Sequence, residues 1–357
     1  MNLLDATFLE EHYSEIKEER ISGRHITLND IKPLFDGLDK NIEHKIIGKS
    51  EVGKDIYQLK LGSGKRKILV WSQMHGNEST GTKAVFDFLN FIKLHSKNKI
   101  VTAVLKNCTI KIIPMLNPDG AEVYTRVNAN GIDLNRDAVA LHAKESKLLR
   151  SILDRFKPDF CFNLHDQRTI FGVEGTKNPA TISFLAPSEE ESRKITKGRK
   201  ETMNVIVSMN GLLQKIIPNY IGRYTDEFYP TATGDNFQKL GHNTILIEGG
   251  HYPNDYEREI VRKYNFFAIL QGIYHISVTK NFENHLDYLS IPNNIKNFYD
   301  VIYRSKNNQK DVAYQYVEKL ENSKFALDLI KEKEGDLSSY LGHKEFKEKD
   351  INLNISQ

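Results

Sequence analysis

The sequence predicts an α/β protein with a mixed, mostly parallel central sheet sandwiched by helices, and with extra helices at the N- and C-terminal ends. Two observations predict this class. Short, near-continuous apolar runs such as Ile68–Ser72 are typical of central strands that helices cover on both faces. These runs alternate with longer segments of helical character, which is typical of a parallel sheet. The length of 357 residues suits one large domain with attachments, or two domains.

The N-terminal region, residues 1–45, is expected to be helical. Phe8, Tyr13 and Ile16 recur at helical spacing, and the segment from Thr27 to Asp30 resembles a helix start. The compact core is expected to follow, over residues 46–276.

The core is expected to alternate between strands and helices. Its predicted strands are Ile56–Leu61, Ile68–Ser72, Thr109–Met115, Asp159–Leu164, Ile182–Ala186 and Thr244–Ile247. Its predicted helices are Ser79–Leu94, Ala138–Phe156, Glu189–Asn210 and Asp255–Ile276.

The C-terminal region, residues 277–357, changes in character. Asn and Lys become frequent, and Tyr314, Val317 and Leu320 fall on one helical stripe. We therefore expect a C-terminal helical extension, to which the sequence assigns no role.

The bulk composition excludes several classes of partner. Lys and Arg number 50 against 47 Asp and Glu, so nothing draws the whole chain to nucleic acid or to an anionic membrane. No run of about 18 apolar residues is present, and the stretch Met1–Glu19 is too acidic for a signal peptide. Cys108 and Cys161 lie in apolar runs and are expected as buried thiols. A cytoplasmic protein is the expectation, and the sequence does not predict its oligomeric state.

Polar side chains follow two of the predicted strands. His75 and Glu78 lie three residues apart just after the strand Ile68–Ser72, and His165 follows Asp159–Leu164 directly. Ligands bind at the carboxyl ends of strands in open α/β sheets. Two histidines and one glutamate are good zinc ligands and leave a fourth position open, as in catalytic sites. Each residue alone is also compatible with a surface or core role.

Further polar residues surround this predicted zinc site. Glu248 directly follows the strand Thr244–Ile247. There it can act as a general base to water or, in a structural role, form a salt bridge or cap a helix. Arg136, beside Asn135, is suited to grip a substrate carboxylate, because arginine pairs bidentately with carboxylates.

Taken together, these motifs resemble the zinc carboxypeptidases of the carboxypeptidase A type, especially the short bacterial branch that trims small peptides. The resemblance spans residues 46–276 and is carried by His75-Gly76-Asn77-Glu78, Asn117-Pro118-Asp119-Gly120, Asp133-Leu134-Asn135-Arg136, Asn163-Leu164-His165 and Glu248.

The resemblance implies one zinc ion per chain, bound by His75, Glu78 and His165. It implies that Glu248 promotes attack by water, that Arg126 stabilises the oxyanion, and that Asn135 and Arg136 bind the substrate carboxylate. Tyr229 is the best match to the tyrosine that closes over the substrate, and Tyr224 is a weaker one.

The function implied is hydrolysis of the amide bond next to a free carboxylate of a peptide, such as a small cell-wall peptide. Asp235 is either a contact for a basic substrate group or a turn residue. The first alternative is a deacylase of N-acyl amino acids, like succinylglutamate desuccinylase and aspartoacylase. The second is an inactive carboxylate-binding scaffold, against which the complete set of ligand and base positions speaks.

Overall fold

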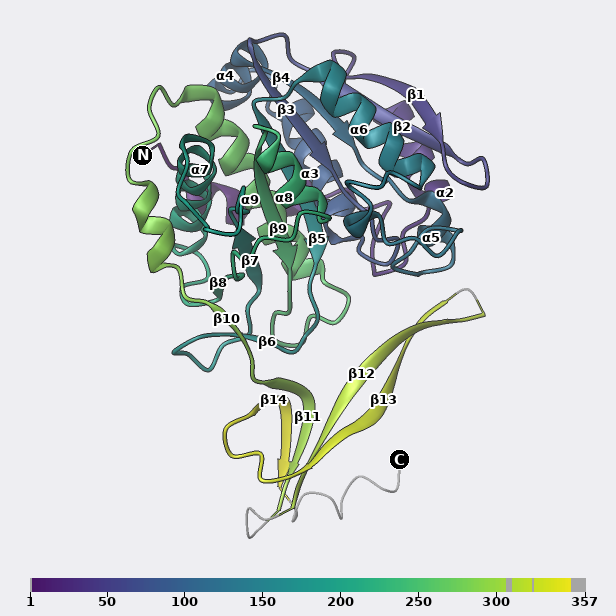
Figure 1. Ribbon diagram of the computed structural model, residues 1–357, viewed down its shortest axis with the longest axis vertical. Coiled ribbons are helices and arrows are strands. Elements are labelled where there is room, and N and C mark those ends of the chain that lie inside the picture. Colours follow the sequence, from purple (N-terminus) through teal and green to yellow (C-terminus); the bar gives the residue numbers. More distant parts are fainter. Residues whose placement is uncertain (1, 306–309, 323, 348–357) are drawn as a thin grey trace.

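The computed structural model describes residues 2–305, 310–322 and 324–347. Its main body is an eight-stranded mixed sheet in the order β1-β2-β4-β3-β5-β9-β7-β8 (Figure 1). In that order the strands are Glu43–Lys49, Asp55–Leu61, Cys108–Ile113, Arg66–Trp71, Phe160–Asp166, Asn243–Gly249, Ile182–Leu185 and Ile221–Arg223.

The four central strands β4, β3, β5 and β9 are parallel. Strand β2 is antiparallel to β4, and β7 is antiparallel to β9. The predicted mixed sheet with a parallel centre is therefore confirmed. Each of the six predicted core strands is present, with ends that differ from the prediction by no more than two residues.

Helices cover both faces of the sheet. One layer contains α1 (Ala6–Ile16), α3 (Thr80–Leu94), α4 (Lys99–Asn107), α7 (Lys197–Leu213) and α9 (Glu259–Val278), and the other contains α6 (Lys144–Phe156) and α8 (Thr233–Lys239). Along β3, Ile68 and Val70 pack with the first layer, and Leu69 and Trp71 pack with the second. Because successive side chains of a strand point to opposite faces, both faces must be covered.

All four predicted core helices begin later than expected, and the difference is largest for α7 and α6. Helix α7 begins at Lys197, because the side chain of Thr196 accepts a hydrogen bond from Arg199 N and caps it. Helix α6 begins at Lys144, because Asp137 instead accepts hydrogen bonds from the backbone of His142 and Ala143 in the preceding loop.

The N-terminal helices are confirmed. Helix α1 buries Leu9, Tyr13 and Ile16, and Thr27 forms a capping box with Asp30 at the start of α2 (Leu28–Ile31). Short helical turns follow at Lys32–Gly37, at α5 (Pro118–Glu122), at Leu134–Arg136 and at His285–Ser290. Cys108 and Cys161 are buried free thiols, as expected.

The helices predicted after residue 277 are wrong. Apart from the turn at His285–Ser290, this region is a separate four-stranded sheet below the main body in Figure 1, in the order β13-β12-β11-β14. Its strands are Lys324–Gly335, Asp311–Glu321, Phe298–Arg304 and Leu341–Lys347. A short strand before it, β10 (Asn294–Lys296), pairs with β6 (Phe171–Val173) of the main body.

The error has a physical cause in β12. Its buried positions alternate, as a strand requires, but they are occupied by Asp311, Ala313 and Gln315. Two of these three side chains are polar, so hydrophobic periodicity does not reveal the strand. Tyr314 and Val317, taken for a helical stripe, are also residues that favour strands.

Candidate metal centre and active site

The first candidate site segment, residues 75–78, lies between β3 and α3 and is held against α5. Asn117 caps α5 by accepting from Gly120 N, and its side chain donates to Met74 O. A Cβ atom at Gly76 would lie 2.0 Å from the carbonyl carbon of Gly120, so only glycine fits. This packing fixes the backbone that carries His75 and Glu78.

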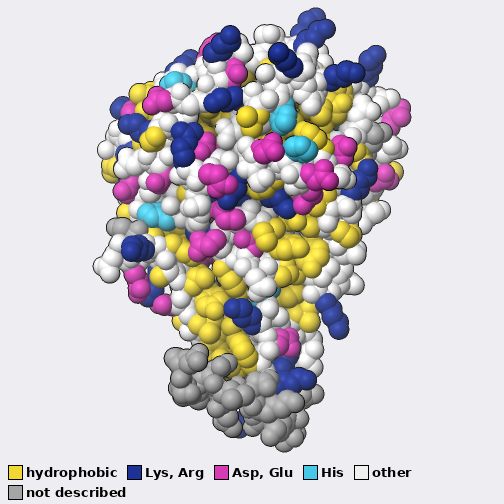
Figure 2. Space-filling view, turned by 180° about the vertical axis from the view of Figure 1, so that it is seen from behind, with side chains coloured by type: hydrophobic (Ala, Val, Ile, Leu, Met, Phe, Trp, Pro, Cys, Tyr) yellow, Lys and Arg dark blue, Asp and Glu magenta, His cyan; other side chains and the backbone are white. Residues whose placement is uncertain are grey.

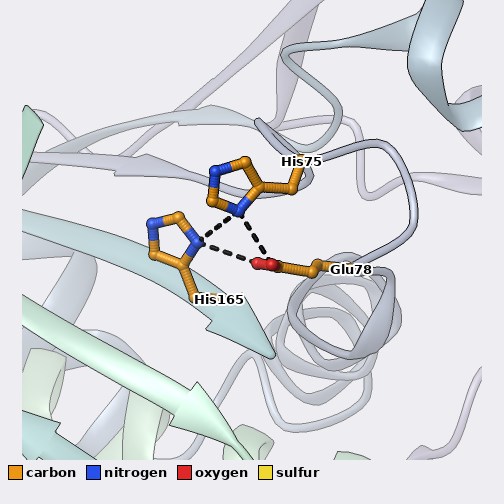
Figure 3. Close-up of side chains that lie close together, drawn as sticks. All are labelled: His75, Glu78 and His165. Carbon is orange, nitrogen blue, oxygen red and sulfur yellow. Dashed lines mark hydrogen bonds and ion pairs between the residues drawn. The ribbon is translucent and has the colours of Figure 1, made fainter. Parts of the chain in front are cut away.

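His75, Glu78 and His165 converge on one point (Figure 3). Glu78 Oε1 lies 2.8 Å from His75 Nδ1, and its Oε2 lies 2.8 Å from His165 Nδ1. The two Nδ1 atoms are 3.1 Å apart. All three side chains are buried, and their ligand atoms lie within 4.8 Å of one another.

Two of the three side chains are in the protonation state that suits a metal ion, whereas burial lowers the pKa of His75 but Glu78 and Asp133 raise it by more. The two histidines hold the pKa of Glu78 well below its ordinary value although burial raises it, so Glu78 is ionised. Burial lowers the pKa of His165, which favours the neutral imidazole that binds metals. Two imidazole nitrogens and a carboxylate facing one point are a donor set that zinc prefers. The residues therefore fit a zinc ion.

Glu248 lies beside the cluster. It is the register partner of His165 on the neighbouring parallel strand, so the two side chains share a face of the sheet. Burial, with the nearby charges of Glu78 and Asp166, raises its pKa well above the ordinary value. Within the described part of the chain, its Oε2 has no hydrogen-bond partner. A carboxylate in this state is a stronger base than usual, and a cation on Glu78 would lower its pKa.

Arg126 joins the cluster from the loop after α5. Its Nη1 lies 3.3 Å from Glu78 Oε1, and its Nε donates to Asp133 at 2.9 Å. The side chain is 45% exposed, so it is accessible from the solvent side of the cluster. The structure therefore brings Arg126 together with the three predicted ligands.

Asn135 and Arg136 follow Asp133 in a single helical turn. Asn135 Oδ1 accepts from Thr233 N at 3.0 Å, which leaves its amide nitrogen available. Arg136 is exposed and donates to Asn135 O, and among the described residues its guanidinium forms no ion pair. Both side chains can therefore still bind a carboxylate.

The two tyrosine candidates differ in position. Tyr229 is 52% exposed, and its hydroxyl donates to Glu227 at 3.0 Å, so it does not contact the metal cluster. Tyr224 is largely buried, and burial together with the charge of Glu248 raises its pKa. In this conformation Tyr224 is therefore nearer to the reactive carboxylate.

Asp235 is buried and accepts a hydrogen bond from Tyr229 N at 3.1 Å. The predicted turn is wrong, because Asp235 lies in the first turn of helix α8, where its carboxylate bonds to the backbone of the preceding loop. Asp133 has a role that the sequence did not assign. Its Oδ1 lies 3.0 Å from His75 Nε2, the ring nitrogen that does not face the cluster. The sequence signal that could have identified Asp133 is its position two residues before Asn135, within one of the motifs that carry the resemblance.

The arrangement defines a class of site: three side chains that fit one metal ion, with a buried carboxylate and an arginine beside them, at the carboxyl ends of parallel strands. This is the type of site that metal-dependent hydrolases have. The family model described as zinc carboxypeptidase matches residues 37–334. The chain therefore belongs to the zinc carboxypeptidase family, whose members use zinc.

Individual relatives agree with this family. Carboxypeptidase 2 of Trichophyton tonsurans is 29% identical over 133 residues, which cover 34% of this chain and 24% of that protein. The carboxypeptidase N catalytic chain of Homo sapiens is 29% identical over 112 residues, covering 26% of this chain and 24% of that one. The chain thus spans about a quarter of the length of these relatives.

Solved structures share the fold. A metallo-carboxypeptidase from Burkholderia cenocepacia superposes with a TM-score of 0.56 at 16% identity, covering 71% of this chain and 69% of that chain. A metallo-carboxypeptidase from Pseudomonas aeruginosa, in complex with (2-guanidinoethylmercapto)succinic acid, gives 0.55 at 16% identity, with 71% and 69% covered. Within the described ranges, no helix has the length and apolar character needed to cross a membrane.

Proposed function

We propose that this protein is a zinc-dependent carboxypeptidase, which hydrolyses the amide bond next to the free carboxylate of a peptide. The observation that carries the proposal is the convergence of His75, Glu78 and His165 within 4.8 Å, beside the buried carboxylate of Glu248. Membership of the zinc carboxypeptidase family supports it.

His75, Glu78 and His165 would hold the metal. Zinc supplies Lewis acidity, which polarises a carbonyl group and makes water more acidic. Glu248 takes a proton from the attacking water and passes it to the leaving amine, for which its raised pKa suits it.

Arg126 stabilises the negative charge that develops on the carbonyl oxygen. Its Nη1 pairs with Glu78 in this structure, and a cation bound to Glu78 weakens that pair and frees the donor. Asn135 and Arg136 hold the substrate carboxylate, which places the scissile bond beside Glu248. Tyr229, on the loop that precedes α8, adds a hydroxyl when that loop closes on the substrate.

The experiment is a hydrolysis panel on protein whose zinc content has been measured by mass spectrometry. The panel contains short peptides with a free C-terminus, the same peptides amidated at the C-terminus, γ-linked cell-wall peptides and N-acyl amino acids. We expect about one zinc per chain and hydrolysis of the free-carboxylate peptides alone, because amidation removes the charge that Arg136 binds.

Two results would contradict the proposal. Cleavage of N-acyl amino acids without cleavage of peptides would identify a deacylase. A preparation without stoichiometric zinc, and without activity after zinc is added, would identify an inactive scaffold. The cytoplasmic location and the preference for small cell-wall peptides stay predictions.

A further inference from the structure

A cavity of about 440 Å³ opens beside the metal cluster. This volume lies within the ~300–1,000 Å³ typical of small-ligand sites. Glu78 and Arg126 line one end of it, and the segment 166–169 after β5 lines another part. The remaining wall includes Tyr316, Val317 and Leu327 of the β12–β13 hairpin. The C-terminal sheet therefore contributes directly to a space that reaches the candidate active site.

The hairpin is fixed against the main body at its far end. Glu318 accepts from Arg24 at 2.7 Å and from the hydroxyl of Tyr124 at 2.9 Å. The Arg24 guanidinium also lies 5.5 Å from the ring centroid of Phe325, and Tyr124 packs edge-on against that ring. Burial raises the pKa of Glu318, but the charges of Arg24 and Arg258 lower it by more, so the pKa lies below its ordinary value. Glu318 is therefore ionised, and its ion pair with Arg24 is intact.

The hairpin is also fixed at a second point, nearer the start of β12. Gln315 donates to Thr169 at 2.6 Å, and Tyr316 packs edge-on against Tyr256 with ring centroids 5.0 Å apart. In the view of Figure 2, hydrophobic side chains gather in the lower half of the molecule, the half that holds the C-terminal sheet in Figure 1. Because the hairpin contacts the main body at both of these points, it forms a fixed wall of the cavity.

The cavity lies on one defined side of the scissile bond. Asn135 and Arg136, which would hold the substrate carboxylate, do not line it, whereas Arg126 does. Arg126 bonds to Asp133, just before Asn135, and to Glu78, at the metal cluster. The cavity therefore extends from the cluster away from the carboxylate site, where the acyl part of a substrate must lie.

The charges of the cavity are not balanced. Four arginines and three carboxylates line it. Arg24 pairs with Glu318, and Arg126 pairs with Glu78 and Asp133. Arg258 pairs with Asp166 at 3.9 Å and bonds to two backbone carbonyls. Arg168 is exposed and, in the part of the chain that the structure describes, has neither an ion pair nor a hydrogen bond. A divalent ion on Glu78 would add further positive charge.

We propose that the β12–β13 hairpin and Arg168 form the binding site for the acyl part of the substrate, and that Arg168 selects an anionic group there. The inference rests on the proposed function, which places the substrate carboxylate at Asn135 and Arg136 and therefore the acyl part on the opposite side of the scissile bond. A guanidinium without an internal partner can form a bidentate pair with a carboxylate. The wall formed by Val317 and Leu327 limits the size of the side chain beside it.

The first test uses peptide pairs with the same C-terminal residue and either Glu or Gln on the acyl side. For the zinc-loaded protein we expect kcat/KM to be about tenfold higher for the Glu peptide, the effect of one charge-assisted pair. Arg168→Gln should bring the ratio close to one, and Arg168→Lys should retain part of it. Arg155→Gln on α6, which removes an equal charge outside the cavity, should keep the wild-type ratio.

A binding measurement separates this inference from the proposed function. In the zinc-loaded Glu248→Gln protein, dissociation constants for the two peptides should differ by the same factor, and Arg168→Gln should abolish the difference. If wild type hydrolyses neither peptide, the proposed function fails, but the dissociation constants still decide the inference. Equal affinity for the Glu and Gln peptides, or no affinity for either, overturns it.

The wall is tested by Leu327→Ala, with Ile330→Ala on the same strand as control, because Ile330 is exposed and does not line the cavity. Leu327→Ala should raise kcat/KM for a bulky acyl-side residue relative to alanine by at least about threefold. Thermal unfolding confirms that both variants fold. If Leu327→Ala leaves the ratio of kcat/KM for the bulky residue and for alanine unchanged, or if Ile330→Ala changes it equally, the hairpin does not limit the size of the acyl-side residue.

Discussion

His75 Nε2 lies 3.0 Å from Asp133 Oδ1, while the other ring nitrogen, Nδ1, faces Glu78 and His165. The second oxygen of Asp133 accepts from Arg126 Nε at 2.9 Å. One carboxylate therefore orients both a metal ligand and the arginine that would stabilise the oxyanion. His75 and Arg126 also lower the pKa of Asp133 although burial raises it, which keeps it ionised.

Asp133→Asn should weaken zinc binding by about 10- to 100-fold, because a partner that fixes the orientation and basicity of a histidine ligand contributes this much. The asparagine oxygen can still accept the hydrogen bond from Asn135 N that the aspartate accepts, so the local turn should remain. Competition with a chelator measures the affinity. Asp154→Asn, an exposed position on α6, is the control, and equal zinc affinity in the two variants would refute the role of Asp133.

Glu248→Gln should separate chemistry from metal binding. Loss of the general base should lower kcat by about 10²- to 10⁴-fold, while zinc content stays close to one per chain. His165→Ala should lose the zinc itself, because it removes one of three ligands. Kinetics and metal analysis of both variants provide the check. Loss of zinc in Glu248→Gln would show that Glu248 is a ligand, contrary to its assignment.

Tyr229→Phe should raise KM by about 2- to 10-fold, the effect of one hydrogen bond, with little change in kcat. The reason is that its exposed hydroxyl, now bound to Glu227, would act only after the substrate has entered. Tyr224→Phe is the matched comparison. If KM rises only in Tyr224→Phe, the substrate-binding role belongs to the tyrosine that already lies near Glu248.

The metal cluster was predictable because it depends chiefly on which strands are neighbours. Strands β3 and β5 are near-continuous apolar runs that are parallel neighbours, so His75, which follows β3, and His165, near the end of β5, meet at one edge of the sheet. Glu248 is found by the same argument, since β9 lies next to β5. Asp133 was missed because its contact with His75 depends on the path of an irregular loop, which hydrophobic periodicity does not describe.

The C-terminal sheet was not predictable from periodicity. In β12 the buried side chains of Asp311 and Gln315 bond to polar partners, namely Arg304 and Thr169. Strand β14 joins the sheet by pairing in parallel with β11, which lies about forty residues earlier in the chain. Such non-local pairing leaves no local pattern, so the wall that β12 and β13 add to the cavity is visible only in the folded chain.

The stability of the protein should depend on pH through Asp235. Burial raises the pKa of this carboxyl to about 6, above its ordinary value of 3.8. The folded state therefore prefers the protonated acid, so stability should fall as the pH rises from about 4 to about 6, and the full cost should remain above that range. Asp235→Asn keeps an oxygen that can accept from Tyr229 N but carries no charge. The variant should be more stable than wild type by about 2–3 kcal/mol near pH 7 and about equal near pH 4. Urea unfolding at both pH values measures this difference, and a variant that is less stable near pH 7 would show that the ionised carboxylate has a favourable partner in the folded protein.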